Sequence, residues 1–125
     1  MTREGINTSE LTPPVGPFSH AVKAGELTYL SGEVAQNPQT GKLIDGDVAA
    51  QTEQVFTNLK LVLKALDKDF SNVIKANVYL ASMDDFSAMN GVYARQFRAP
   101  YPARTTVAVA ALPLAAKVEI ELVVR

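Results

Sequence analysis

The sequence contains no cysteine and no tryptophan, and its only histidine is His20. Without cysteine, the chain has no disulfide, no thiol nucleophile and no thiolate-bound metal ion. One histidine is too few for a metal site built from several imidazole rings. Any chemistry must therefore rely on carboxylates, guanidinium groups, amines, hydroxyls, amides, the backbone or the one imidazole.

The sequence also has no excess of positive charge and no long apolar run. Lysine and arginine together number 12 against 13 acidic residues, which gives a formal net charge of −1. A nucleic-acid binder normally carries a basic stripe, so this charge balance argues against nucleic acid as a partner. A membrane span would need about 20 consecutive apolar residues. The first ten residues include Glu4 and Glu10 and lack the apolar core of a signal peptide. We expect a cytoplasmic protein with no membrane partner.

Hydrophobic residues make up 47% of the 125 residues, which is typical of a globular protein. This length suits one domain with a substantial core. No internal repeat or linker interrupts the chain. We therefore predict a single domain over residues 1–125.

One long amphipathic helix is predicted from Asp47, which can cap its start, to about Leu66, with Asp67 ending it. The apolar residues recur at three- and four-residue spacing and should form one buried stripe. That stripe comprises Thr52, Val55, Phe56, Leu59, Val62, Leu63 and Leu66. The solvent-facing side is expected to carry Gln51, Glu53, Asn58, Lys60 and Lys64.

A second helix is predicted after Ser82, because Ser82 and Asp85 have the spacing of a capping box. Its apolar stripe consists of Phe86, Met89, Tyr93 and Phe97. Asn90 falls inside this stripe. A buried amide needs hydrogen-bond partners, so Asn90 should either brace backbone or reach into a polar pocket.

Strands are predicted around these helices. At most one short edge strand is expected within residues 1–14, followed by strands over 18–22, 27–32, 73–80, 105–109 and 118–122. Gly25-Glu26 should form the turn of a hairpin. In the strand over 73–80, the residues expected on one face are Ile74, Ala76, Val78 and Leu80. His20 is interpreted as a surface histidine.

Arg104 and Glu119 stand near strand ends in an otherwise apolar segment. A guanidinium fork beside a carboxylate suits a small carboxylic acid held next to an acid–base group. A structural ion pair or two solvated side chains would give the same pattern. A simple hairpin would pair the two strands, but the connection through Pro113 is long enough to cross a neighbouring strand.

The order of elements is strands, helix, strand, helix, strands. Two helices can cover only one face of such a sheet. The strand from Thr106 to Ala110 is small or apolar on both faces. Another subunit should therefore cover the second face, and we expect an oligomer.

Motifs along nearly the whole chain resemble the RidA (YjgF) family. They are Gly16-Pro17-Phe18-Ser19, Leu30-Ser31-Gly32, Asn37-Pro38, Asp85-Phe86 with Asn90 and Tyr93, Tyr101-Pro102-Ala103-Arg104, Ala111-Leu112-Pro113, and Val118-Glu119-Ile120-Glu121. The resemblance implies an α+β, chorismate-mutase-like fold: a mixed sheet with two helices on one face, assembled as a homotrimer with ligand clefts between subunits.

The same resemblance implies an enamine/imine deaminase that needs no cofactor and no metal. Such enzymes hydrolyse reactive 2-aminoacrylate or 2-iminobutanoate products of PLP enzymes to 2-keto acids and ammonia. By this resemblance, Arg104 would clamp the substrate carboxylate and Glu119 would position the attacking water. The pocket would be lined by Phe18, Ser31, Gly32, Asn90, Ala103 and Thr106.

Two positions depart from the family pattern. Phe18 stands where deaminase members usually carry tyrosine, and Thr106 stands where many have cysteine or another small residue. The first change removes a phenolic hydroxyl from the pocket. Two alternatives stay open: a non-catalytic trimer that binds a metabolite but is too slow without the phenol, and a single-strand endoribonuclease or translation inhibitor, as some members of the family are described.

Overall fold

The computed structural model describes residues 2–125, so Met1 of the predicted domain lies outside the described residues. The elements follow one another along the chain as six strands and two α-helices, with three short 3-10 turns between them. They are β1 (Glu4–Ile6), β2 (Ala21–Ala24), β3 (Leu27–Leu30), α1 (Val48–Ala65), η1 (Phe70–Asn72), β4 (Val73–Leu80), η2 (Met83–Asp85), α2 (Phe86–Ala94), β5 (Ala103–Ala108), η3 (Pro113–Ala115) and β6 (Val118–Val124).

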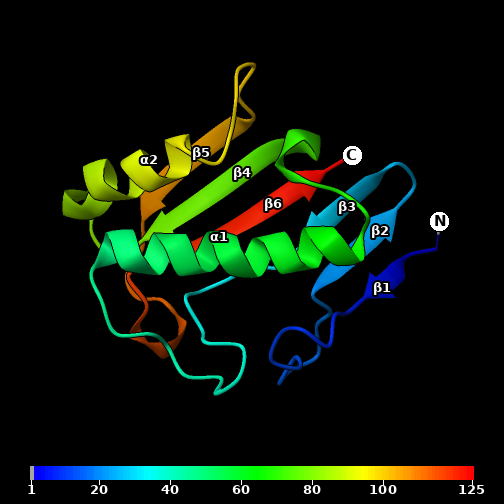
Figure 1. Cartoon of the computed structure of the whole chain (residues 1–125), viewed down its shortest axis with the longest axis horizontal. Helices are drawn as coiled ribbons and strands as arrows, with labels where there is room; N and C mark the ends of the chain where they lie inside the picture. The colour runs from blue at the N-terminus through cyan, green and yellow to red at the C-terminus, as the bar shows by residue number, and fades with distance from the viewer. Residues whose placement is uncertain (1) are drawn as a thin grey trace.

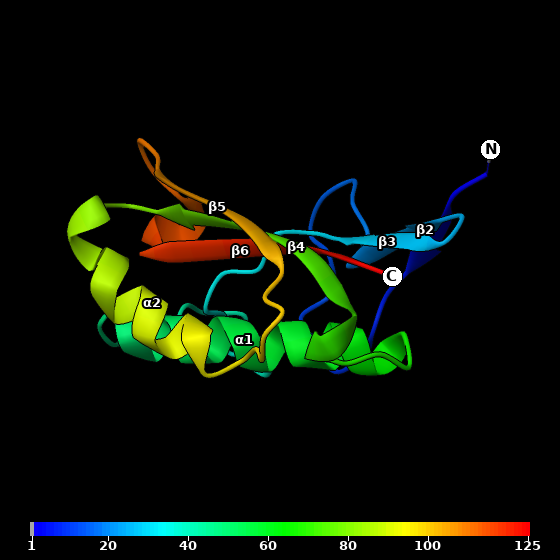
Figure 2. The same cartoon turned by 90° about the horizontal axis from the view of Figure 1, so that it is seen from above.

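All six strands form one sheet in the order β1-β2-β3-β6-β4-β5. The β4–β5 pair is parallel and the other pairs are antiparallel. Both helices pack against the same face of this mixed sheet (Figures 1 and 2). The predicted α+β architecture with two helices on one face is confirmed.

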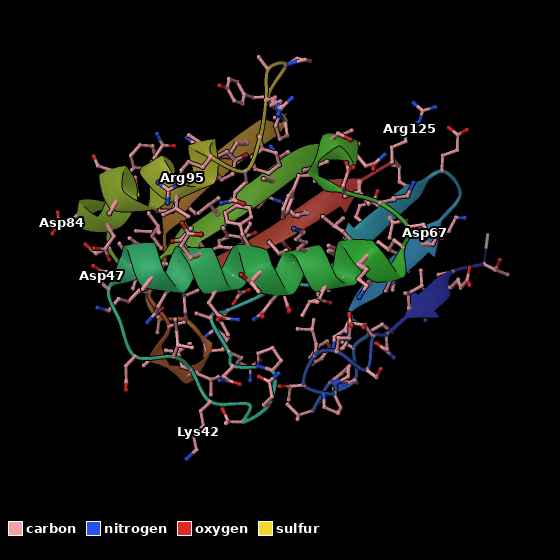
Figure 3. The ribbon with its side chains drawn as sticks, viewed as in Figure 1. Lys42, Asp47, Asp67, Asp84, Arg95 and Arg125 are labelled. Carbon is pink, nitrogen blue, oxygen red and sulfur yellow. The ribbon has the colours of Figure 1, made fainter. Side chains whose placement is uncertain are left out.

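The predicted start and end of α1 are confirmed. The side chain of Asp47 accepts a hydrogen bond from the Ala50 N–H at 2.9 Å, which satisfies one donor of the first turn. Asp67 takes a left-handed conformation with φ of 55° just beyond the helix end. The two residues mark the ends of α1 in Figure 3. The predicted stripe from Thr52 to Leu63 is buried against the sheet.

Two amides that were predicted to face solvent on α1 are in fact buried. Gln51 is 3% exposed, and its Oε1 accepts from the Lys117 N–H at 2.9 Å. Asn58 is 2% exposed, and its Nδ2 donates to the Gln36 carbonyl at 2.9 Å and to the Val34 carbonyl at 3.3 Å. Polar side chains can be buried where they satisfy backbone groups of crossing loops.

Strand β4 also departs from simple alternation. A register shift between Val73 and Lys75 inserts an extra residue against β6. Val73 is therefore buried, whereas Ile74, which was predicted on the buried face, is 44% exposed. The extra residue of a β-bulge interrupts the alternation of side chains, so the residues before and after it no longer follow one period of two. The predicted strand over 18–22 likewise begins only at Ala21.

An aromatic cluster of Phe56, Phe70, Tyr93 and Phe97 joins the two helices. Phe56 on α1 makes edge-to-face contacts with the other three rings, with centroids 5.6 to 6.0 Å apart. Each such pair contributes about 0.5–1.5 kcal/mol beyond the apolar area that it buries. The cluster therefore fixes α2, which carries Asn90, relative to the rest of the core.

The second face of the sheet is covered by neither α1 nor α2 (Figure 2). Tyr29 on β3 and Val107 on β5 lie on this face and are 50% and 41% exposed. Neither α1 nor α2 has the length and apolarity that crossing a membrane would require.

Candidate active site

Arg104 is held on the helix-covered face by side chains of α2. Its Nη1 donates to Asn90 Oδ1 at 2.7 Å. Its guanidinium carbon lies 4.6 Å from the ring centroid of Tyr93 and 5.5 Å from that of Phe86. These three residues occupy positions i, i+4 and i+7 of α2 and so lie on one side of the helix. The amide within the apolar stripe thus braces the guanidinium rather than the backbone.

No carboxylate pairs with Arg104 within residues 2–125. The partners that hold it are neutral: one amide oxygen and two aromatic rings. A guanidinium carries five N–H donors, so most of its hydrogen-bonding capacity is left for an anion. The geometry positions the charge without neutralising it.

Two buried hydroxyls accompany Arg104 without hydrogen-bond partners in the described chain. They belong to Tyr93, whose ring lies under the guanidinium, and to Thr106, two residues further along β5. Burial raises the pKa of the Tyr93 phenol, and the positive charge of Arg104 opposes that shift. Ala103, the residue before Arg104, is exposed.

Gly32 brings Glu119 close to the end of β3. A Cβ atom at Gly32 would overlap Oε2 of Glu119, so this approach requires glycine. Ser31 next to it has a structural task, because its hydroxyl donates to the Ser19 carbonyl at 2.6 Å. Its N–H donates to the His20 carbonyl at 3.0 Å. These bonds fix the segment that carries Phe18 against β3.

A cavity of about 310 Å³ opens beside Gly32 and Glu119. Most of its walls are apolar, and the half-exposed ring of Phe18 forms part of them. Its lining residues are Leu11, Thr12, Pro13, Pro14, Val15, Phe18, His20, Gly32, Glu33, Val34, Gln36, Pro38, Asn58, Pro113, Leu114 and Glu119.

Two carboxyl groups share this cavity. Burial, followed by the charge of Glu121, raises the pKa of Glu119. Burial also raises the pKa of Glu33 to about 7, with the charge of Glu119 as the second cause. Sequence reasoning missed Glu33, although an acidic residue directly after the Ser31-Gly32 pair was a signal that could have been used.

The interpretation of His20 as a surface residue is wrong, because its side chain is 5% exposed and lines the cavity. Its Nδ1 accepts from the Thr8 N–H at 3.1 Å. Its Nε2 lies 3.0 Å from the Thr12 carbonyl, to which it donates in the matching tautomer. The hydrogen-bond partners of the buried ring are backbone groups of a loop 8 to 12 residues earlier in the sequence. The residues next to His20 therefore gave no indication that it is buried.

Arg104 and Glu119 do not meet within one chain. Strand β4 lies between β5 and β6, and in its register Ala76 pairs with Arg104 and with Leu122, while Tyr79 pairs with Glu119. Side chains of paired residues point to the same side of a sheet. Arg104 therefore shares the helix-covered face with buried Leu122, and Glu119 projects from the opposite face. The connection through Pro113 crosses β4 and does not form a hairpin.

The predicted site residues thus form two groups. Asn90, Ala103, Arg104 and Thr106 lie on α2 and β5; Phe18, Gly32 and Glu119 line the cavity, and Ser31 stands beside it. Across residues 2–125, no three histidine, aspartate or glutamate side chains gather closely enough to hold a metal ion.

Comparison with known proteins identifies the family. The family model described as Endoribonuclease L-PSP matches residues 8–125. Reactive Intermediate Deaminase A, chloroplastic, from Arabidopsis thaliana is 46% identical over 123 residues, which cover 98% of this chain and 66% of the relative. A 2-iminobutanoate/2-iminopropanoate deaminase from Dermatophagoides farinae is 41% identical over 125 residues, covering 99% of this chain and 98% of the relative.

Solved structures agree with the sequence relatives. The crystal structure of RidA from an Antarctic Psychrobacter species superimposes with a TM-score of 0.91 at 40% identity, covering 97% of this chain and 98% of that one. The fold, the matched length and the named relatives lead to one conclusion: the chain belongs to the Endoribonuclease L-PSP family, that is, the RidA (YjgF) family.

Proposed function

We propose that this protein hydrolyses reactive enamines and imines of the 2-aminoacrylate and 2-iminobutanoate type, released by PLP enzymes, to 2-keto acids and ammonia. The observation that carries the proposal is the state of Arg104, whose guanidinium is braced by Asn90 and two aromatic rings but has no carboxylate partner within residues 2–125. Relatives named 2-iminobutanoate/2-iminopropanoate deaminase support the substrate class.

In this proposal Arg104 holds the carboxylate of the substrate. A planar guanidinium binds a carboxylate through two parallel N–H bonds, which fixes orientation as well as position. The contacts with Asn90, Tyr93 and Phe86 restrict its rotation before the substrate arrives. Less side-chain entropy is then lost on binding.

Glu119 acts as the general base in the same proposal. Its carboxylate removes a proton from a water molecule as the oxygen attacks the imine carbon, while the electron pair of the C=N bond moves to nitrogen and the nitrogen takes up a proton. The protonated Glu119 then returns its proton to the amino group as the hydroxyl of the carbinolamine loses its own, so that ammonia leaves and a 2-keto acid remains. A raised pKa brings a carboxyl closer to the working pH, where proton transfer is more effective.

The arrangement of the two residues favours an oligomeric site. Since Arg104 and Glu119 project from opposite faces of one sheet, a ligand that contacts both requires two subunits. We propose a homotrimer in which Arg104 of one subunit faces the cavity around Glu119 of the next. The exposed Tyr29 and Val107 on the face without helices supply apolar surface for such contacts.

The test is a coupled assay with freshly generated 2-iminobutanoate, in which release of 2-oxobutanoate is followed with and without the protein. Acceleration over the uncatalysed reaction is expected. Binding of 2-oxobutanoate without acceleration would instead favour the alternative of a non-catalytic metabolite-binding protein. The absence of a phenolic hydroxyl at Phe18 is the feature that favours this alternative. If the protein neither accelerates the hydrolysis nor binds 2-oxobutanoate, the proposal is overturned.

A further inference from the structure

The cavity holds a second carboxyl group that the reaction above does not use, that of Glu33. Its backbone is locked to β6 by two hydrogen bonds: the Glu33 N–H donates to the Ile120 carbonyl at 2.9 Å, and the Ile120 N–H donates to the Glu33 carbonyl at 3.1 Å. This bridge places Glu33 directly opposite the residue that follows Glu119. The distance between the two glutamates is therefore set by backbone pairing rather than by flexible loops.

The two carboxyl groups approach the cavity from different sides of the backbone. Glu33 is paired with Ile120, so its side chain leaves on the side of the buried Ile120, whereas Glu119 leaves on the other side. Because Gly32 has no side chain, the carboxylate of Glu119 can lie against the Gly32 backbone, in the space that a Cβ atom would fill. Both groups consequently line one cavity.

The surroundings of Glu33 offer it no counter-charge. The titratable residues that line the cavity in the described chain are His20, Glu33 and Glu119. Both ring nitrogens of His20 are committed to Thr8 and Thr12, and the Asn58 amide is committed to the 34–36 loop. A carboxyl in apolar surroundings beside a second carboxyl retains its proton more strongly, and the pKa of Glu33 is raised to about 7 accordingly.

We propose that Glu33 is the acid of this site and works as a pair with Glu119 as base, an inference that rests on the proposed hydrolysis. As water attacks the imine carbon, Glu119 accepts the proton of the water and the protonated Glu33 donates its proton to the imine nitrogen. A C–O bond forms and the C=N double bond becomes a C–N single bond.

In the second half of the reaction the roles reverse. Glu33, now ionised, accepts the hydroxyl proton of the carbinolamine, and protonated Glu119 delivers its proton to the amino group. The C–N bond breaks, ammonia leaves and the carbonyl of the 2-keto acid forms. Both carboxyl groups end in their starting states, so no oxidant, metal or further co-reactant is required.

The experiment compares the pH profile of kcat/KM for 2-iminobutanoate in the parent, Glu33→Gln and the control Glu26→Gln. Glu26 lies in the β2–β3 turn beside Arg125, so its substitution makes the same replacement of a carboxyl by an amide away from the cavity. For the parent and the control, the rate should fall as the pH rises through about 7, where Glu33 loses its proton. Glu33→Gln should lose about 10²-fold in kcat and lack this alkaline decline.

A Glu33→Gln variant with the parent's rate and profile would overturn the role of Glu33 alone. A parent without any turnover would overturn the proposed function itself. Carboxyl ¹³C NMR titration of the parent, labelled at glutamate, gives a readout that needs no turnover and no Glu33 variant. Glu33 should titrate near neutral pH and shift downward in Glu119→Gln; titration at its ordinary value of 4.5 would also overturn the proposal.

Discussion

Arg104 and Glu119 project from opposite faces of one sheet, and β4 separates their strands. Within a single chain the guanidinium and the carboxylate cannot contact the same small molecule. The proposed deaminase site therefore depends on contacts between subunits, and this dependence can be tested directly.

Mixing two inactive variants should restore activity. Arg104→Ala and Glu119→Gln would each lack half of the site, but in mixed assemblies some sites combine an intact arginine with an intact glutamate. For equal amounts and random exchange in a cyclic oligomer, about one quarter of the sites would be intact. Turnover of the co-refolded mixture should approach that fraction of the parent. No recovery, despite demonstrated exchange, would place both residues in sites of a single subunit.

Glu119→Gln should separate chemistry from binding. The amide keeps the size of the side chain but cannot accept the proton of water. We expect 2-oxobutanoate to bind as in the parent, while imine hydrolysis falls about 10²-fold. Calorimetric titration and the coupled assay measure the two effects. If turnover were unchanged, Glu119 would have a structural task only.

Arg104→Lys should retain the charge but lose the fork. Hydrogen bonds to charged groups contribute roughly 1.5–3 kcal/mol each, so loss of one should weaken 2-oxobutanoate binding about tenfold to a hundredfold. Stability should change little, because Arg104 leaves no buried carboxylate behind in the described chain. Arg125→Lys, at an exposed ion pair with Glu26, is the matched control. If a folded Arg104→Lys protein bound 2-oxobutanoate as tightly as the parent, Arg104 would not bind the carboxylate through two parallel hydrogen bonds.

Gly32→Ala should displace Glu119 without unfolding the protein. The added Cβ overlaps the carboxylate end of a flexible side chain, which can move at little cost. Misplacement of a reacting group by about 1 Å can cost about 10²-fold in rate, so kcat should fall while the melting temperature stays close to the parent's. Gly91 is an exposed residue of α2, and an added Cβ there meets no neighbouring atom within 4 Å, so Gly91→Ala should stabilise the helix by about 0.5–1 kcal/mol with unchanged kcat. Equal kcat in both variants would contradict the steric argument.

The raised pKa of Glu33 should also appear in stability. In the folded protein Glu33 holds its proton up to about pH 7, whereas in the unfolded chain it ionises near 4.5. The folded state therefore binds more protons between these values, and this contribution to the free energy of unfolding is complete below 4.5 and lost as the pH rises to about 7. Urea unfolding at one protein concentration should show the decline in the parent but not in Glu33→Gln. Parallel pH dependences would argue against a buried protonated carboxyl.

Local signals in the sequence predicted the elements well. The Asp47 cap, the reversal at Asp67 and the apolar spacing of both helices depend on residues within a few positions of one another. Burial of polar groups was not predictable in this way. Gln51 binds the backbone of Lys117, and His20 binds that of Thr8 and Thr12. Such partners become neighbours only through the fold.

The same distinction applies to the candidate site. The family resemblance supplied Arg104, Glu119 and the residues around them, but not the faces of the sheet from which they project. Whether two strands separated by a long connection pair directly or enclose a third is decided by the whole sheet. Glu33 was overlooked because its importance comes from backbone pairing with Ile120, which is 87 positions further along the chain.

The position of β6 has a consequence for how the protein folds. The strands β1–β3 and the strands β4–β5 are joined into one sheet only through β6, which comes last among the described elements. A nascent chain on the ribosome would thus hold two half-sheets with unpaired edges until residues 118–124 emerge. Pairings between distant segments slow folding, and exposed edges invite association with the wrong chain. Assembly of the complete sheet should therefore wait for residues 118–124, and the insertion of β6 between β3 and β4 is the step that completes it.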